Sequence, residues 1–233
     1  MNNTKRTNDQ RIKRVAIAAM FTALAYIVML VFHIKVQFLT FEFKDAVMTI
    51  GAMICGPVYA VIMSLVTSLI EFFTVSDTGA YGLIMNVVAS VAFTLPASLI
   101  YKYKRSMTGA LIGLVTSIFT MTALMLAANL FITPLYTGMD IKGVAELIPA
   151  LLLPFNLTKA MLNAGVVILL YKPISTALKK AKLLAPTAQN GEATDRSGRI
   201  ITTIIMTLIS LILISISVMI FVIVLGGKSR FGL

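Results

Sequence analysis

Three polar side chains lie close together within a stretch of chain that is otherwise apolar, "LLLPFNLTKAMLNAGVVILLY" at residues 151–171. Asn156, Lys159 and Asn163 are spaced i, i+3 and i+7, which places them on one face of a helix. A lysine within hydrocarbon costs roughly 2.5–3.5 kcal/mol, so such a residue usually faces a cavity or a partner. Amides both donate and accept hydrogen bonds, whereas an ammonium group only donates them. The pattern therefore indicates the polar wall of a small-molecule pocket rather than a catalytic site.

Lys159 has two alternative roles that stay open. Its long side chain reaches the membrane interface if the helix begins near Pro154, because the ammonium then lies only about 8 Å along the axis. Alternatively, it forms a structural ion pair with Asp45 or Glu71. The two amides on the same face gain nothing from reaching the interface, which favours the pocket.

Two further asparagines fall at a similar depth in other apolar segments. Asn86 lies in "YGLIMNVVAS" and Asn129 in "LMLAANLFITPLY". Each alone is typical of a hydrogen bond between membrane helices, which contributes about 0.6–2 kcal/mol. Together with the triad on the later helix, they predict a polar pocket in the outer half of the bilayer, open to the outside.

An outer loop at residues 33–45, "HIKVQFLTFEFKD", alternates apolar and polar side chains. Val36, Phe38, Phe41 and Phe43 are its apolar members. The loop could cover the pocket as a lid, and its rings would suit a flat aromatic ligand, because stacking favours ring faces. Anchoring of the aromatic residues at the membrane interface accounts for the same pattern equally well.

The elements that must position these residues are membrane helices. The chain of 233 residues is 58% hydrophobic and only 12% charged, about half the charge of a soluble domain. Seven apolar runs approach the roughly 20 residues that span a bilayer. We predict an all-α polytopic membrane protein with a six-helix core and an appended C-terminal transmembrane helix. The predicted helices cover residues 15–32, 46–55, 58–75, 83–103, 107–131, 149–171 and 200–225.

Basic residues give the orientation. Most of the 20 Lys and Arg residues fall in the N-terminal segment and in every second connection, as expected when those segments are cytoplasmic. The N-terminus is therefore predicted inside, as a retained helix rather than a cleaved signal, and the loops at 33–45, 72–80 and 134–148 outside. The predicted regions are a basic N-terminus at 1–14, a substrate-binding core at 15–182, a flexible linker at 183–199, the extra helix at 200–225 and a tail at 226–233.

Several function classes are disfavoured by what the sequence lacks. There is no Walker A motif, HExxH or GxSxG, and the single Cys55 and single His33 provide no metal cluster. No titratable pair is predicted at a spacing suited to acid–base catalysis. The net charge of +11 follows from cytoplasmic loops rather than nucleic-acid binding. The chain is therefore predicted not to be an enzyme and to contain no metal or cofactor.

The order of several segments resembles a known family. These segments are "FLTFEFKDAVMTIGAMICGPVYAVI", "EFFTVSDTGAYG", "AANLFITPLY" and "PFNLTKAMLN", after an alanine-rich first helix. Over residues 11–180 the chain looks like the substrate-binding S component of an energy-coupling-factor (ECF) vitamin transporter, in the riboflavin-binding branch. The resemblance implies a six-helix protein in a bacterial cytoplasmic membrane that binds riboflavin near its outer face. A membrane T subunit and two cytoplasmic ATPase subunits would drive uptake.

The resemblance also implies roles for individual residues. Asn156 and Lys159 match the family's Asn-x-x-Lys motif, and Asn129 matches the family's asparagine before the "PLY"-like segment. The small-xxx-small pattern of the first helix resembles the surface by which the family docks on the T subunit. FMN as a second ligand stays open. So do another vitamin whose carboxylate binds Lys159, and a membrane scaffold or sensor without transport. For Asn163, a turn deeper, two roles stay open: it binds ligand or it joins two helices. The residues expected to bind ligand are Asn129, Asn156, Lys159, Asn163, Asn86, Leu39, Thr40 and Phe41, and those expected to dock on a partner are Ala16, Ala19 and Ala23.

Overall fold

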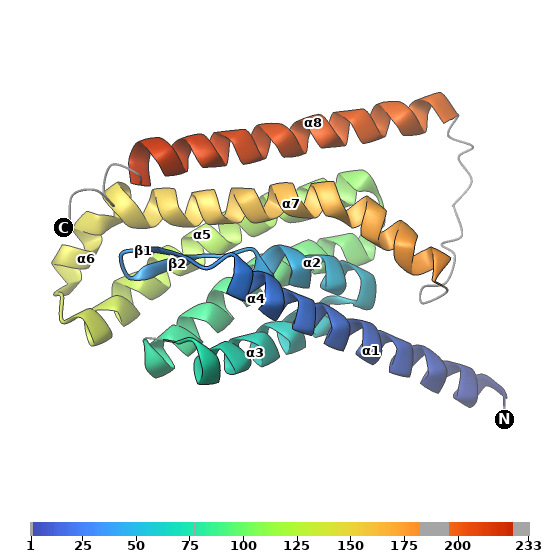
Figure 1. Cartoon of the computed structure of the whole chain (residues 1–233), viewed down its shortest axis with the longest axis horizontal. Coiled ribbons are helices and arrows are strands. Elements are labelled where there is room, and N and C mark those ends of the chain that lie inside the picture. Colours follow the sequence, from blue (N-terminus) through green and yellow to red (C-terminus); the bar gives the residue numbers. More distant parts are fainter. Residues whose placement is uncertain (1, 77, 182–195, 226–233) are drawn as a thin grey trace.

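The computed structural model describes residues 2–76, 78–181 and 196–225, which form a bundle of helices with one short hairpin (Figure 1). This arrangement confirms the predicted fold class. The helices are α1 (Asn2–Val31), α2 (Lys44–Cys55), α3 (Pro57–Thr74), α4 (Gly79–Tyr103), α5 (Met107–Thr137), α6 (Ile141–Leu147), α7 (Leu153–Lys180) and α8 (Arg196–Ile220). Two π-helical turns, η1 (Ile148–Leu152) and η2 (Phe221–Leu225), and two strands, β1 (Ile34–Val36) and β2 (Leu39–Phe41), complete the described part.

Six segments of the described chain are long and apolar enough to cross a membrane. They include α1, α3, α4, α5, the continuous segment from α6 through α7, and α8. Helix α2 is too short, since its 12 residues extend only about 18 Å against roughly 30 Å of hydrocarbon. The core of six helices therefore consists of five spanning segments and one shorter, enclosed helix.

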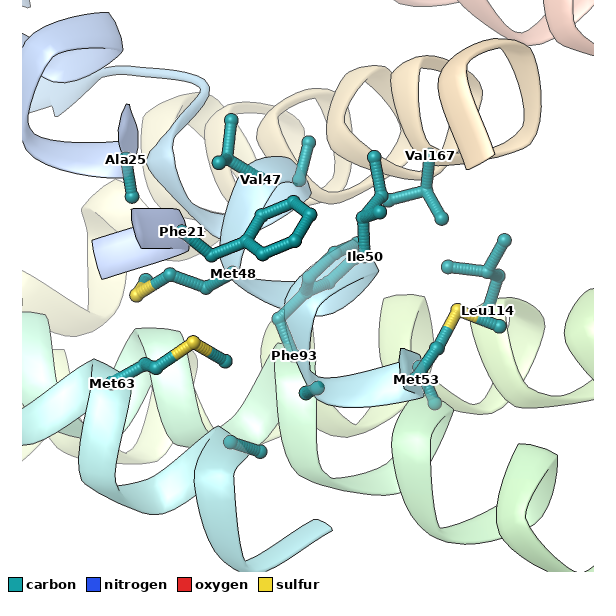
Figure 2. Packing of buried hydrophobic residues seen from close by; sticks show 14 of the residues in the cluster. Phe21, Ala25, Val47, Met48, Ile50, Met53, Met63, Phe93, Leu114 and Val167 are labelled. Atoms are coloured by element: carbon teal, nitrogen blue, oxygen red, sulfur yellow. The ribbon is translucent and has the colours of Figure 1, made fainter. Parts of the chain in front are cut away.

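Helix α2 lies at the centre of the core. Every one of its residues except Ile54 is buried, which explains why a short helix with a charged N-terminal end is tolerated at membrane depth. Gly56 permits the sharp turn into α3 with its positive φ of 117°, and Pro57 begins that helix. The apolar side chains that converge here from α1, α2, α3, α4, α5 and α7 include Phe21, Met48, Ile50, Met63, Phe93, Leu114 and Val167 (Figure 2).

The predicted outer loop at 33–45 contains an antiparallel hairpin. Val36 pairs with Leu39 and Ile34 with Phe41, so the turn consists of Gln37 and Phe38 alone. Gln37 has a φ of 54°, the left-handed conformation that the first position of such a tight turn requires. The hairpin leads directly into α2 and so carries its side chains to the N-terminal end of that helix.

Two predicted boundaries around residue 134 are wrong. Helix α5 continues beyond Phe131 and through Pro134 to Thr137, where Gly138 ends it in a left-handed conformation. The segment 134–148 is consequently not a loop, because it contains the end of α5, the short helix α6 and the beginning of η1. Asp140 caps α6 by accepting a hydrogen bond from the Gly143 amide at 2.9 Å.

The appended seventh helix is present as α8, which runs beside α7 (Figure 1). It begins at Arg196, so the last residues of the predicted linker at 183–199 are helical. The rest of that linker, and the predicted tail at 226–233, lie outside the described residues.

Candidate substrate-binding site

A cavity of about 200 Å³ opens at the hairpin end of the bundle. Its wall is formed by the hairpin, the end of α3, the beginning of α4, α5 and the beginning of α7. Five of the residues predicted to bind ligand line it, and they come from three separate parts of the chain: the hairpin, α4 and α7. These residues are Leu39, Thr40, Asn86, Asn156 and Lys159.

Aromatic rings from several elements also line the cavity. Phe38 lies at the hairpin turn, and its ring centroid is 6.5 Å from that of Tyr136 of α5. Phe155 projects from α7. Tyr136 is in turn stacked on Tyr81 of α4, with centroids 6.0 Å apart. A cavity with aromatic walls and a few placed polar groups is typical of small-molecule binding sites.

Lys159 is held by the hairpin. Its Nζ donates to the Thr40 carbonyl at 3.1 Å and to Glu42 Oε1 at 3.0 Å. The ion pair expected as an alternative therefore exists, but its partner is Glu42 rather than Asp45 or Glu71. Because Lys159 also lines the cavity, pairing with Glu42 and facing a ligand are compatible roles.

The ion pair continues into a buried network. Lys44 Nζ lies 3.0 Å from Glu42 Oε1 and also pairs with Glu71 Oε2. Glu71 Oε1 then accepts a hydrogen bond of 2.7 Å from Asn86 Nδ2. The chain of contacts joins α7, the hairpin, α2, α3 and α4, and both of its ends, Lys159 and Asn86, belong to the cavity wall.

The network contains more carboxyl groups than ammonium groups. Glu42 pairs with both Lys44 and Lys159, and Glu71 pairs with Lys44. Asp45, the residue after Lys44, is a third carboxyl group and accepts a hydrogen bond from Ser90 Oγ at 2.6 Å; all five ionisable side chains are buried. Glu42 Oε2 and Asp45 Oδ2 are buried without a hydrogen-bond partner in the part of the chain that the structure describes. Both lysines of the network, Lys44 and Lys159, are thus already matched by carboxylates.

The protonation of Glu42 follows from its neighbours. Burial alone would raise the pKa of this carboxyl group, but the ammonium groups of Lys159 and Lys44 outweigh burial and lower the pKa to about 2. Glu42 is therefore ionised at any physiological pH and acts only as an acceptor for the two lysines.

Three of the predicted ligand-binding residues lie outside the cavity wall. Asn163 is fully buried, its Oδ1 accepting from the Ala46 amide at 2.8 Å and its Nδ2 donating to the Glu42 carbonyl at 3.1 Å. Asn129 bonds within α5, and Phe41 packs on Phe155. None of the three lines the cavity, and Asn163 links α7 to the segment that enters α2.

Apart from Asp45 and Glu71, which the sequence suggested as alternative partners of Lys159, the charged residues of this network are not assigned to the site by sequence patterns. Glu42 and Lys44 stand in "TFEFKD", and Glu71 stands within an apolar run. Glu71 is the one signal that the sequence offers, because an unpaired charge in a spanning segment is costly and a glutamate there indicates a buried cationic partner. Which lysine it pairs with depends on the hairpin and on the packing of α2 against α3.

The alanines predicted to dock on a partner lie on the outer face of α1. Ala16, Ala19 and Ala23 are exposed, whereas Ile17 and Phe21 of the same helix are buried in the core. A face of small residues allows another helix to approach closely. The structure thus leaves this face uncovered by the rest of the described chain.

Comparisons with known proteins cover the core. The profile of the family described as "ECF transporter, substrate-specific component" matches residues 13–174. The chain is 31% identical to the riboflavin transporter RibU of Staphylococcus aureus (strain TCH60), over 77% of this chain and 100% of the relative. It is 23% identical to the riboflavin transporter FmnP of Bacillus subtilis (strain 168), over 69% of this chain and 91% of the relative.

A solved structure shows the same arrangement. It is described as the structure and mechanism of the S component of a bacterial ECF transporter, and it matches with a TM-score of 0.62 and 28% identity. The match covers 72% of this chain and 99% of the solved one. The relatives are transport proteins rather than enzymes, which confirms the prediction that the chain is not an enzyme. With the family profile matched from α1 through most of α7, this multi-pass membrane chain belongs to the substrate-specific components of ECF transporters.

Proposed function

We propose that the chain binds riboflavin in the cavity and carries it across a bacterial cytoplasmic membrane, driven by ATP through its partner subunits. Two relatives of the chain are named riboflavin transporters. The observation that carries the proposal is the cavity wall, in which Asn86, Asn156 and Lys159 meet the hairpin residues Leu39 and Thr40. In the proposed orientation the N-terminus is inside and the cavity opens outward. No nucleic acid is involved, and membrane lipid surrounds the helices.

The chemistry of Lys159 suits a neutral ligand. An ammonium group has three donor hydrogens, and the Thr40 carbonyl and Glu42 take two of them. One donor remains for a carbonyl of the flavin ring or a hydroxyl of the ribityl chain. The amides of Asn86 and Asn156 add groups that both donate and accept, as the uracil-like edge of the ring requires. Asn129, Asn163 and Phe41 do not line the cavity, and in this proposal they hold the elements that form its wall.

The charge of the network opposes an anionic ligand at the same position. A carboxylate placed on Lys159 would compete with Glu42 for the ammonium and would approach Glu71, which also lines the cavity. Like charges at close range in a poorly solvated site are strongly unfavourable. We therefore infer that riboflavin, rather than a vitamin bound through a carboxylate, is the ligand.

The purified protein is expected to quench riboflavin fluorescence in a saturable manner at micromolar ligand, because the flavin ring would lie among Phe38, Tyr136 and Phe155. The measurement is a fluorescence titration in detergent, followed by competition with biotin and folate as carboxylate-bearing vitamins. Neither should displace riboflavin. Displacement by either would contradict the charge argument, and absence of quenching would contradict the flavin assignment itself. The same titration carried out with FMN decides whether the site also accepts the phosphorylated ligand.

Transport also requires partners, and α1 offers the surface for them. We infer that a T subunit docks on the exposed alanine face and connects the chain to two ATPase subunits. Replacing Ala19 by leucine is expected to reduce riboflavin uptake by about tenfold or more, since extra methylenes in a packed contact cost about 1–3 kcal/mol. Binding by the isolated subunit should stay unchanged, because Ala19 points away from the core.

Uptake assays and co-purification with the T subunit measure this effect. The matched control is Ala123→Leu, which adds the same side chain at an exposed position of α5. Equal loss of uptake in both variants would show a general effect of the larger residue. Full uptake in Ala19→Leu would remove this face of α1 from the proposed contact.

A further inference from the structure

Helix α8 lies outside the part of the chain that matches the family profile, yet it is fitted closely to α7. Its contact stripe repeats at spacings of seven and four residues, the pattern by which one helix packs along another. Lys172 of α7 donates to Thr203 near the beginning of α8, and Ile214 and Phe221 pack farther along the stripe. The contact therefore extends along most of α8.

The middle of this contact admits no side chain on α7. Ser210 Oγ donates to the Gly165 carbonyl at 2.7 Å, and Ser210 is fully buried although most of α8 is exposed. A Cβ at Gly165 would lie 2.8 Å from Ile214 Cγ1, closer than real contacts allow. Glycine at this position thus lets α8 rest directly on the backbone of α7.

The outer end of α8 reaches the hairpin. The ring of Phe221, in η2, lies 5.7 Å from that of Phe41 at an angle of 71°, an edge-to-face contact. Phe41 is 3% exposed and also meets Phe155 edge to face at 5.8 Å. Phe41 follows Thr40 in β2, and Thr40 is the residue whose carbonyl holds Lys159. One ring therefore separates α8 from the wall of the cavity.

We propose that α8 is a positioning element of the binding site, in which Phe221 supports Phe41 and so holds the hairpin over the cavity. Because α7 and the hairpin form different parts of the wall, an element fixed to both restricts their relative movement. The Gly165 contact fixes α8 to α7, and the Phe221 contact fixes it to the hairpin.

This role leaves the proposed docking face free. Helix α8 runs along α7 at one edge of the bundle, whereas α1 extends from beside α2 in the middle of the view, away from α8, to the N-terminus (Figure 1). Ala16, Ala19 and Ala23 stay exposed with α8 in place. The appended helix can therefore act on the site without covering the surface assigned to the T subunit.

Phe221→Ala in the full chain tests the proposal through hydrogen–deuterium exchange of the ligand-free protein, measured by mass spectrometry. Loss of the ring contact is expected to raise the exchange rate of the hairpin, residues 34–41, by about 3- to 10-fold. This factor corresponds to the stabilisation that an edge-to-face aromatic pair provides. Exchange in α3 and α4 should stay at the wild-type rate. Riboflavin dissociation should accelerate by a similar factor, a readout that rests on the proposed function, whereas the exchange readout does not.

The matched control is Ile223→Ala, which shortens an exposed side chain in the same turn η2 and should leave hairpin exchange unchanged. Phe221→Leu, which keeps apolar bulk, should restore part of the protection. Unchanged hairpin exchange in Phe221→Ala would overturn the proposal, as would an equal increase in α3 and α4, because that indicates general destabilisation. Faster hairpin exchange with an unchanged rate of riboflavin dissociation would contradict the proposal that α8 positions the binding site. If the wild type binds no riboflavin, the proposed function fails, while the exchange comparison still decides what α8 does.

Discussion

Replacing Glu42 by alanine is expected to lower the free energy of unfolding by about 3–5 kcal/mol, since removing one partner of a buried ion pair leaves uncompensated charge. Glu42 is fully buried and lies 3.0 Å from both Lys44 and Lys159. Lys44 would keep Glu71, but Lys159 would lose its only ion-pair partner within the described residues. The change is therefore larger than that of an ordinary surface ion pair, which contributes at most about 1 kcal/mol.

Unfolding of the purified protein in mixed micelles measures this effect, with the melting temperature as a second readout. Glu146→Ala is the control, because it removes an exposed carboxylate from α6 and should change stability by no more than about 0.5 kcal/mol. Glu42→Gln should fall between the two, since it keeps the volume and the acceptor oxygen but not the charge. Equal stability of Glu42→Ala and Glu146→Ala would mean that the network contributes nothing to the fold.

The contribution of Glu42 has a defined pH window. Its pKa falls from 4.5 to about 2 on folding because of the two ammonium groups, despite its burial. A lowered carboxyl pKa stabilises the folded state fully above the unfolded value and loses this effect as the pH decreases through the folded value. The stabilisation by Glu42 is therefore constant at neutral pH and decreases only between pH 4.5 and about 2.

The sequence predicted the helices and part of the cavity wall because both depend on local periodicity. The spacing of Asn156 and Lys159 requires a shared helix face, and both residues line the cavity. Asn163 has the same spacing but lies a turn farther along α7, at the depth where α2 begins. Its neighbour is therefore a backbone amide instead of a ligand, and no helical pattern contains that information.

The hairpin and the end of α5 show what local patterns leave out. The hairpin turn lacks the Asn-Gly or Asp-Gly pair that usually identifies a two-residue turn, since it consists of Gln37 and Phe38. The predicted helix at 107–131 stopped short of Pro134, a residue that removes one backbone hydrogen bond from a helix. Within a bundle, neighbouring helices compensate for this loss, so α5 continues for another turn. Tertiary packing decided both features.

Replacing Lys159 by methionine is expected to weaken riboflavin binding by about 10- to 100-fold, because a hydrogen bond from a charged group contributes about 1.5–3 kcal/mol. Methionine keeps most of the length and the apolar stem of the side chain, so the shape of the wall is preserved. Its sulfur donates no hydrogen bond, and the ligand loses the one donor that Thr40 and Glu42 leave unused. Fluorescence titration with riboflavin measures the change in affinity.

The same substitution also leaves Glu42 with one ammonium group instead of two, so weaker binding alone does not separate ligand contact from damage to the network. The double variant Glu42→Gln with Lys159→Met separates them, because it removes both charges of the pair at once. Stability should recover relative to Lys159→Met, since replacing both partners of a buried pair costs far less than removing one. Riboflavin affinity should stay low, because the donor is still missing. Recovery of both stability and affinity would show that Lys159 acts only through Glu42 and the hairpin, and the ligand contact would then have to come from the amides of Asn86 and Asn156.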